Sequence, residues 1–496
     1  IVTAWCYDNR CLIRSKNGGP PMVALPTLPV SGNLLERGLR GLVGVWRGIA
    51  GGDETGQIGR EGALGQKDVE RLRHLFSECL EARGGEVSAR ARAAALGRLY
   101  LGLTDEGKRA FLQTLANGFS ADAAELDKAI AEVQSAPDPV SRHKAERKLR
   151  LALTPPRQRL LTQFTALPQG VKFLVDLRAD AFRFKKDAPE LAILDADLED
   201  LFVAWFDVGF LELQRITWNS PAALLEKLIA YEAVHAIESW DDLRNRLDSD
   251  RRCYAFFHPR MPLEPLIFVE VALVKGIAGN VQALLDQSSP VLDPREADTA
   301  IFYSISNTQV GLRGISFGNF LIKRVVDDLS RELPHLKQFS TLSPIPGFCK
   351  WLNEAIAQGT PDLVSADARE KLREALGKRF SKGMLPSLLK DNSWVDNPPL
   401  AEAMKPVLLR LCARYLLTAQ ERGRPRDPVA RFHLSNGATV HRLNWLGDRS
   451  KNGMTQSAGI MVNYLYRLDD IDQNHERFQR DGTIAASSEV RRLAAL

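Results

Sequence analysis

The chain has 496 residues, of which 45% are hydrophobic and 26% charged, a composition typical of globular proteins long enough for more than one domain. Its 66 Lys and Arg residues against 61 Asp and Glu residues give a net charge of +5. This small excess is spread along the chain and argues against a nucleic-acid-binding protein. It suits a polyanionic small ligand, although an ordinary solvated surface explains it equally well.

Membrane and metal-binding classes are also disfavoured. No run of about 18 apolar residues is present, so we expect no transmembrane helix. The six cysteines form no CxxC pair, so we expect neither a metal site nor a disulfide scaffold, and a reducing compartment fits best. The chain carries no secretory signal and ends in RRLAAL rather than a peroxisomal SKL, which predicts a cytoplasmic protein.

Two regions precede the most informative part of the chain. Residues 1–65 are rich in Gly and Pro, so we expect an N-terminal extension of loop or disorder, with one short helix near Leu34–Gly48. Residues 66–190 have a helical pattern, in which apolar side chains recur at three- and four-residue steps: Val69, Leu72, Leu75, Phe76, Cys79 and Leu80. Ser88–Leu103 predicts a second helix, and Thr104 can cap a third. This block is interpreted as a helical bundle whose role is packing or self-association.

Residues 191–496 have the pattern of a region that mixes helices and strands. Runs rich in β-branched and aromatic residues predict strands at Cys253–Phe257, Leu266–Val274 and Thr299–Ser306, and a final strand at Gly459–Leu468. Helices are expected at about 220–233, 318–332, 347–357 and 399–418. Asn436-Gly437 predicts a tight turn between two short strand-like runs.

The loop after the strand Thr299–Ser306 is a candidate anion site. It reads GLRGISFGN over residues 311–319 and leads into the amphipathic segment FLIKRVVDDLSREL. A strand, a loop of small residues and a helix N-terminus together offer free N–H groups and a favourable dipole to a phosphate. An ordinary strand-to-helix turn with two glycines is an equally good interpretation of the loop alone.

Arg313–Gly318 resembles the Q/R-x-x-G/A-x-G/A motif of GCN5-related N-acetyltransferases, in which this loop holds the pyrophosphate of acetyl-CoA. Ser316 stands where that family prefers Gly or Ala, and serine is small enough for the backbone to approach a phosphate.

Four further stretches resemble malonyl-CoA decarboxylases. They are FLVDLRAD at Phe173–Asp180, IFYSIS at Ile301–Ser306, FSTLSPIPGF at Phe339–Phe348 and VARFHLSNGATVHRLNW at Val429–Trp445. The likeness extends over roughly residues 70–490, and SPIPGF together with FHLxNGA is specific to that family.

This resemblance implies the fold class, the site and the partners. It implies an α+β multidomain protein with an N-terminal all-α helical bundle and an acetyltransferase-like catalytic domain built on a mixed central sheet. The helical part would serve oligomerisation as a homotetramer, a dimer of dimers. The catalytic serine falls on Ser343, the catalytic histidine on His433, and the CoA-binding loop on residues Arg313, Gly314, Ile315, Ser316, Phe317, Gly318 and Asn319. Because mammalian members carry a peroxisomal signal, its absence favours a bacterial protein, with a role in fatty-acid and malonate metabolism.

The expected chemistry needs no cofactor beyond the coenzyme A of the substrate. Loss of CO2 from malonyl-CoA leaves an electron pair on Cα that the thioester carbonyl delocalises as an enolate, so the substrate is its own electron sink. His433 is expected to donate the proton, because an imidazole titrates near neutral pH. Ser343 is expected to orient the substrate or to accept a proton.

Several alternatives stay open. Taken alone, His433 would more often be a packed core histidine and Ser343 a turn residue, and His441 could replace His433. Asn463 and Tyr464 could reach the site from the final strand, whereas His235, His258 and His335 have no candidate partners in sequence. A CoA-dependent acyltransferase or a catalytically inactive CoA-binding protein would keep the same loop, and turnover of malonyl-CoA without an acceptor separates these classes.

Overall fold

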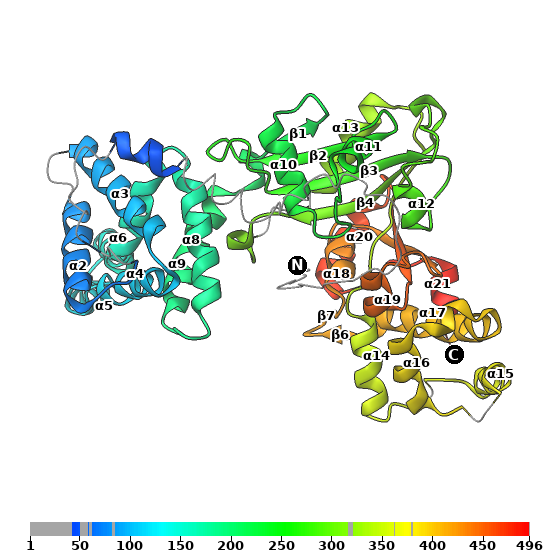
Figure 1. The fold of residues 1–496 in the computed structure, drawn as a ribbon. Coiled ribbons are helices and arrows are strands. Elements are labelled where there is room, and N and C mark those ends of the chain that lie inside the picture. Colours follow the sequence, from blue (N-terminus) through cyan, green and yellow to red (C-terminus); the bar gives the residue numbers. More distant parts are fainter. Residues whose placement is uncertain are drawn as a thin grey trace, which may run out of the picture.

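The computed structural model describes residues 42–49, 58, 62–81, 85–315, 321–361, 363–377 and 380–495. Figure 1 shows two regions: a group of helices formed by the first part of the chain and a larger region built around a sheet. The predicted fold class, a helical region followed by a region with a mixed sheet, is confirmed.

The helical region extends further at both ends than the sequence indicated. Its helices are α2 (Gln66–Glu81), α3 (Gly85–Gly102), α4 (Asp105–Gly118), α5 (Ala123–Gln134), α6 (Pro139–Leu153), α7 (Pro156–Gln163), α8 (Gly170–Phe184) and α9 (Leu191–Trp205). α9 continues the helices past the expected boundary at residue 190, because Leu191, Leu194, Leu198 and Phe202 recur at helical spacing and are buried. The change from helices to strands therefore follows Trp205.

The expected N-terminal extension is not all loop. Residues 42–49 are helical, in part as predicted, while the rest of the predicted helix lies outside the described residues. Trp46 is fully buried, its ring centroid lies 5.1 Å from that of Phe173, and its indole N–H donates to the Pro168 carbonyl. A Cβ on Gly97 would lie 2.1 Å from the Trp46 ring, so a glycine is needed there for the close approach.

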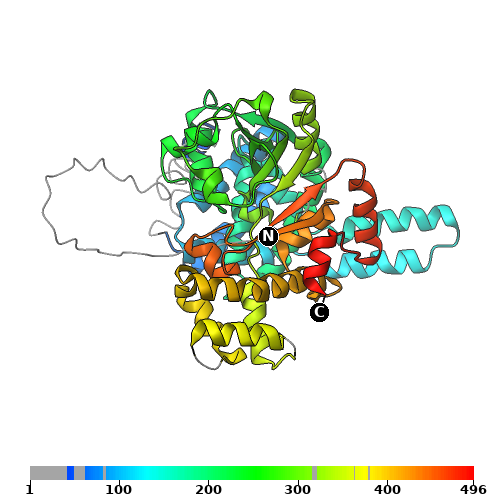
Figure 2. The same ribbon diagram turned by 90° about the vertical axis from the view of Figure 1, so that its right-hand side faces the viewer.

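The α5–α6 pair is a helical hairpin that projects from the rest of the helical region (Figure 2). Its last helix exposes three large apolar side chains, Val140, Leu151 and Leu153.

The second region is organised by a seven-stranded sheet in the order β1-β2-β3-β4-β5-β9-β8. Its strands are β1 (Glu212–Ile216), β2 (Arg251–Phe257), β3 (Ile267–Val274), β4 (Thr299–Asn307), β5 (Gln338–Thr341), β8 (Thr439–Asn444) and β9 (Met461–Tyr466), and β6 (Gln420–Glu421) pairs with β7 (Arg424–Pro425) separately. Among the described strands, only β4 and β5 pair in parallel, and the other neighbours are antiparallel. The strands predicted from the sequence correspond to β2, β3, β4 and β9.

Helices cover both faces of this sheet. The helices of the second region are α10 (Ala222–Tyr231), α11 (Trp240–Arg246), α12 (Val281–Leu285), α13 (Leu321–Glu332), α14 (Phe348–Ala357), α15 (Ala366–Leu376), α16 (Leu385–Asp391), α17 (Pro398–Thr418), α18 (Pro428–Ser435), α19 (Lys451–Ser457), α20 (Ile471–Asp481) and α21 (Ser488–Ala494). The apolar side chains of α13 belong to the cluster that includes Val269 and Phe302, whereas those of α10 belong to the cluster on the opposite face with Cys253 and Phe268. The four helices predicted in this region correspond to α10, α13, α14 and α17.

The segment before Asn436-Gly437 is a helix, α18, so the prediction of a turn between two strand-like runs is wrong. Asp427 accepts hydrogen bonds from the Val429 and Ala430 amides and Pro428 occupies the first turn, which are the signals of a helix start. Gly437, with φ of +80°, follows the helix and leads into β8.

Strands β4 and β5 separate at one point, and this separation positions the site. Phe302 is the last β4 residue paired with β5, and its carbonyl accepts a hydrogen bond of 2.9 Å from the Leu342 amide. Beyond that point β4 continues to Asn307, whereas the chain after β5 bends toward β9, where Ser343 bridges Val462.

Candidate active site

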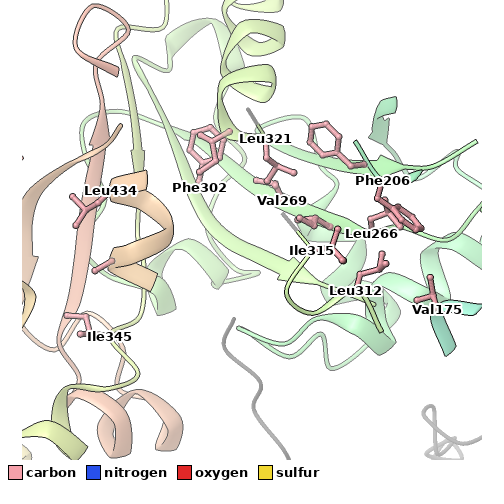
Figure 3. Close-up of a cluster of buried hydrophobic side chains, with 14 of the residues drawn as sticks. Val175, Phe206, Leu266, Val269, Phe302, Leu312, Ile315, Leu321, Ile345 and Leu434 are labelled. Carbon is pink, nitrogen blue, oxygen red and sulfur yellow. The ribbon is translucent and has the colours of Figure 1, made fainter. Parts of the chain in front are cut away.

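A cavity of about 320 Å³ lies where β4 and β5 separate. One wall contains Phe302 and Ile305 of β4 with Leu312, Arg313 and Ile315 of the following loop. Ser343, Phe432 and His433 also line it, so the two predicted catalytic residues share a cavity with the predicted CoA loop. Figure 3 shows Leu312 and Ile315 on one side and Leu434 and Ile345 on the other, with Phe302 between them.

Ser343 and His433 are direct partners although 90 residues separate them in the chain. Ser343 Oγ lies 3.1 Å from His433 Nε2, and both residues are buried. Ser343 is held by backbone hydrogen bonds in both directions with Val462, and His433 is carried by α18. The structure thus brings together the two residues that the resemblance placed in distant motifs.

Two side chains that the sequence analysis did not single out complete a chain of hydrogen bonds. Tyr466 Oη lies 2.8 Å from His433 Nδ1, and the Ser343 hydroxyl donates to Thr341 Oγ1 at 2.8 Å. Burial raises the pKa of Tyr466 well above its usual value, so the phenol keeps its proton. His433 Nδ1 is its one hydrogen-bond partner among the described residues, so the phenol donates to Nδ1, and the neutral ring carries its proton on Nε2, facing Ser343.

His433 was expected to donate a proton because an imidazole titrates near neutral pH, and the structure corrects this reason. Burial lowers the pKa of His433 to about 3, because a charged imidazolium loses its hydration in this apolar surrounding. The ring of Tyr464 stacks on it, with centroids 4.5 Å apart. His433 is therefore a neutral N–H donor in the free protein.

Asp427 joins the two motifs that supply the serine and the histidine. Its carboxylate caps α18 and also accepts hydrogen bonds from the Gly347 amide and the Tyr415 hydroxyl, each at 3.4 Å. Burial raises the pKa of Asp427 to about 6, while these hydrogen bonds act in the opposite direction. The SPIPGF segment and the helix that carries His433 are thus held by one buried side chain.

The predicted CoA-binding loop is described in part. Arg313 and Ile315 line the cavity, and Gly314 has φ of +88°, a conformation that favours glycine. Arg313 Nε and Nη2 are buried and have no hydrogen-bond partner within the described part of the chain, and the guanidinium lies 5.7 Å from the Phe182 ring centroid. Ser316, Phe317, Gly318 and Asn319 lie outside the described residues.

The two additional candidates on β9 differ in role. Tyr464 contacts His433, but Asn463 faces the other side of the strand, where it donates to the Thr341 and Ala278 carbonyls and does not line the cavity. Asn463 therefore supports the sheet. Tyr466 lies on the same face as Tyr464, two residues further along the strand, and this period was the signal that could have identified it.

Two of the other histidines lie in different pockets. His441 lines a separate pocket with Arg467 and Ser487, so it does not replace His433. His235, which had no apparent partners in sequence, lines the same cavity as Ser343, and its Nε2 atom is buried without a partner among the described residues. Among the described residues, no three or more His, Cys, Asp or Glu side chains lie close enough together to hold a metal ion. None of the described helices is long and apolar enough to cross a membrane.

Two family models match this chain, one for each region. Residues 119–206 match the malonyl-CoA decarboxylase N-terminal domain and residues 209–495 match the C-terminal domain. The two matches meet just after α9, in agreement with the observed end of the helical region.

Curated relatives and solved structures match most of the chain. Malonyl-CoA decarboxylase, mitochondrial, from Anser anser anser is 37% identical over 473 residues, which are 92% of this chain and 93% of that protein. The protein of the same name from Rattus norvegicus is 37% identical over 82% of this chain and 86% of its own length. The crystal structure of malonyl-CoA decarboxylase from Rhodopseudomonas palustris has a TM-score of 0.77 and 47% identity, and covers 86% of this chain and 99% of its own. The enzyme of that name from Agrobacterium vitis has the same TM-score with 44% identity, over 86% of this chain and 100% of its own.

Identity at this level over most of both chains, together with matches to both domain models, shows the family. The chain therefore belongs to the malonyl-CoA decarboxylase family, a family of carboxy-lyases.

Proposed function

We propose that this protein decarboxylates malonyl-CoA to acetyl-CoA and CO2 through a thioester enolate, with Ser343 and His433 at the reacting group and no cofactor beyond the substrate's own coenzyme A. The observation that carries the proposal is the 3.1 Å contact between Ser343 Oγ and His433 Nε2 inside a cavity that the Arg313 loop also lines. One cavity thus offers proton donors at one position and an anion-binding loop at another.

The reaction balances without an oxidant or an acceptor. The bond between Cα and the carboxylate carbon breaks, CO2 leaves, and the electron pair forms the enolate of the thioester. A proton is then transferred to Cα and is replaced from solvent. Hydrogen-bond donors aimed at the developing negative charge typically contribute about 3 to 4 kcal/mol each to lowering the barrier.

His433 and Ser343 would act together as proton donors. With its proton on Nε2, the neutral His433 donates to Ser343 Oγ, which leaves the serine hydroxyl free to turn from Thr341 Oγ1 to the substrate. The hydroxyl can orient the carboxylate or thioester and then supply the proton to Cα, with His433 stabilising the alkoxide that forms. No acyl-enzyme is needed for this chemistry.

The coenzyme A part would be held by residues 313–319. The φ of +88° at Gly314 and the unpartnered Arg313 Nε and Nη2 atoms support this assignment, because a phosphate needs close backbone approach and an available cation.

Direct turnover tests the function. The purified protein is incubated with malonyl-CoA alone, in the presence of a chelator and without an acceptor, and acetyl-CoA and CO2 are measured. Equal amounts of both products, lost in Ser343→Ala and in His433→Ala, are expected. Binding of CoA without any product would instead identify a CoA-dependent acyltransferase or an inactive CoA-binding protein.

The helical region is also proposed to form the interface of a homotetramer. The exposed Val140, Leu151 and Leu153 side chains of the projecting α5–α6 hairpin support this, because a second copy can cover them. Light scattering coupled to size exclusion should give the mass of four chains, and Leu151→Lys should lower it. A monomer for the unmodified chain would contradict the proposal.

The compartment and the metabolic role are proposals as well. The cytoplasm and a part in fatty-acid and malonate metabolism were expected from the sequence, whereas the curated relatives named above are called mitochondrial. Fractionation of the cells that make this protein decides the compartment.

A further inference from the structure

Arg178, in the FLVDLRAD stretch of α8, joins the helical region to the loop after β4. Its side chain is 1% exposed and donates four hydrogen bonds, two to backbone carbonyls and two to carboxylates. Nη1 donates to the carbonyls of Gly311 and Arg313, at 3.0 and 3.1 Å, which lie 133 and 135 residues further along the chain. Nε and Nη2 donate to Asp195 and Glu199 of α9.

These bonds fix the direction of the loop's peptide groups. In a trans peptide unit the carbonyl and the following N–H point to opposite sides. Because the Arg313 carbonyl points at Arg178, the Gly314 N–H points away from α8. A backbone that binds an anion must turn its N–H groups to the ligand, so its carbonyls need donors behind them. Arg178 supplies that donor for two carbonyls.

Close packing supports the same contact. A Cβ on Gly311 would lie 1.8 Å from the carbonyl oxygen of Val175, so the loop lies directly against the α8 backbone. Figure 3 places Val175 next to Leu312, with Ile315 beyond it, and all three side chains are buried.

Arg178 is not free to bind a phosphate itself. Its guanidinium is buried between two carboxylates, at 2.9 Å from Asp195 and 3.0 Å from Glu199, which balance its charge. The available guanidinium is that of Arg313, on the loop. Arg178 therefore acts through the loop and is a positioning residue.

We propose that Arg178 makes the helical region part of the coenzyme A site, by holding the Gly311 and Arg313 carbonyls so that the Gly314 N–H faces the pyrophosphate. This inference rests on the proposed function for the identity of the ligand. It assigns to α8 a role in substrate binding that is separate from self-association.

Arg157 provides a matched control for the test. It is also a buried arginine of the helical region and also pairs with an aspartate of α9, Asp197, but its other contacts are with Ser120, Phe119 and Ala116 within that region. Substituting either arginine removes a buried ion pair with an aspartate of α9, and only Arg178 touches the loop.

The experiment compares Arg178→Gln with Arg157→Gln in the full chain. We measure the Kd of free CoA by calorimetry, and kcat and KM for malonyl-CoA, each corrected for the folded fraction. Arg178→Gln should raise both Kd and KM by about tenfold or more, as expected for the loss of charge-assisted hydrogen bonds, and leave kcat within about twofold. Arg157→Gln should leave all three within about twofold. Equal effects of the two substitutions, or an unchanged Kd in Arg178→Gln, would overturn the inference.

A second pair of variants keeps the test open if Arg178→Gln does not fold. Gly311→Ala pushes the loop from α8, whereas Gly170→Ala creates a similar clash, 1.7 Å from the Phe164 carbonyl oxygen, at the first residue of that helix and away from the loop. Only Gly311→Ala should weaken CoA binding, and the same Kd for both refutes the role of α8. Because CoA binding needs no turnover, a wild-type protein that binds CoA without decarboxylating malonyl-CoA would refute the proposed function alone.

Discussion

The two ends of the cavity differ in how their polar groups are satisfied. At the reacting end, both ring nitrogens of His433 and the hydroxyl of Ser343 have protein partners. At the loop end, Arg313 Nε and Nη2 have none among the described residues, and the loop is held from behind by Arg178. Under the proposed function, the reacting end is organised before substrate arrives, whereas the loop end keeps its donors for the coenzyme A part. Changes at the first end should lower kcat, and changes at the second should raise KM.

The largest effect is expected from Ser343→Ala or His433→Ala. Either removes a proton donor at the reacting end, so kcat should fall at least about 100-fold while the Kd of CoA stays the same. Steady-state kinetics and calorimetry measure the two quantities. Ser457→Ala removes a buried serine hydroxyl whose partners are the Gly453 and Ile460 carbonyls, and it should leave kcat unchanged. Near-normal turnover in His433→Ala would remove this residue from the mechanism.

Gly314→Val should act on the other end of the cavity. A β-branched side chain at φ of +88° forces the loop into another conformation, so KM should rise about tenfold with little change in kcat. Gly377→Val introduces similar backbone strain at φ of +62°, at the end of α15, and serves as the control. A fall in kcat with unchanged KM would place the loop at the reacting end instead.

Tyr466→Phe should have a smaller effect on kcat. It removes the donor to His433 Nδ1 and leaves the ring in place, and the loss of one neutral hydrogen bond predicts a reduction of about threefold to tenfold. Tyr464→Phe is the matched control, because the Tyr464 hydroxyl has no partner among the described residues. Equal reductions in both variants would show that the phenols contribute only by packing.

The smallest effect is expected from pH on His433 itself. Burial lowers its pKa to about 3, so the ring is neutral above that value and no proton is gained between pH 8 and pH 5. Imidazole 15N shifts of the labelled protein should show a neutral ring protonated on Nε2 throughout this range. A titration with a midpoint near the ordinary pKa of histidine, about 6.5, would contradict this electrostatic account.

The sequence predicted the parts of the fold that have strong local signals. The runs at β2, β3 and β4 are continuous, apolar and rich in β-branched or aromatic residues, because these strands are buried on both faces. α18 was missed because its eight residues are too few for a clear period, although Asp427-Pro428 carries the signal of a helix start. α9 was assigned to the second region because the composition changes at residue 190, just before this helix begins. Its helical period, however, continues past that point.

The candidate site was predictable only where motifs carried it. Ser343 and His433 were found through family resemblance, since neither residue has an unusual local environment in sequence. Thr341 and Tyr466 contact Ser343 and His433 from strands β5 and β9, and Asp427, which caps α18, contacts Gly347. Only the folded structure shows these contacts. The contact of Arg178 with Gly311 depends on how two regions pack and leaves no local pattern.

That contact has a consequence for the order in which the chain acquires its structure. Regions near the N-terminus generally fold first during synthesis, and contacts between residues far apart in the chain form late. α8 and α9 leave the ribosome before the loop at residues 311–315 and can present Arg178, already paired with Asp195 and Glu199, as a template. The loop would then take its binding conformation by docking onto a surface that is already folded.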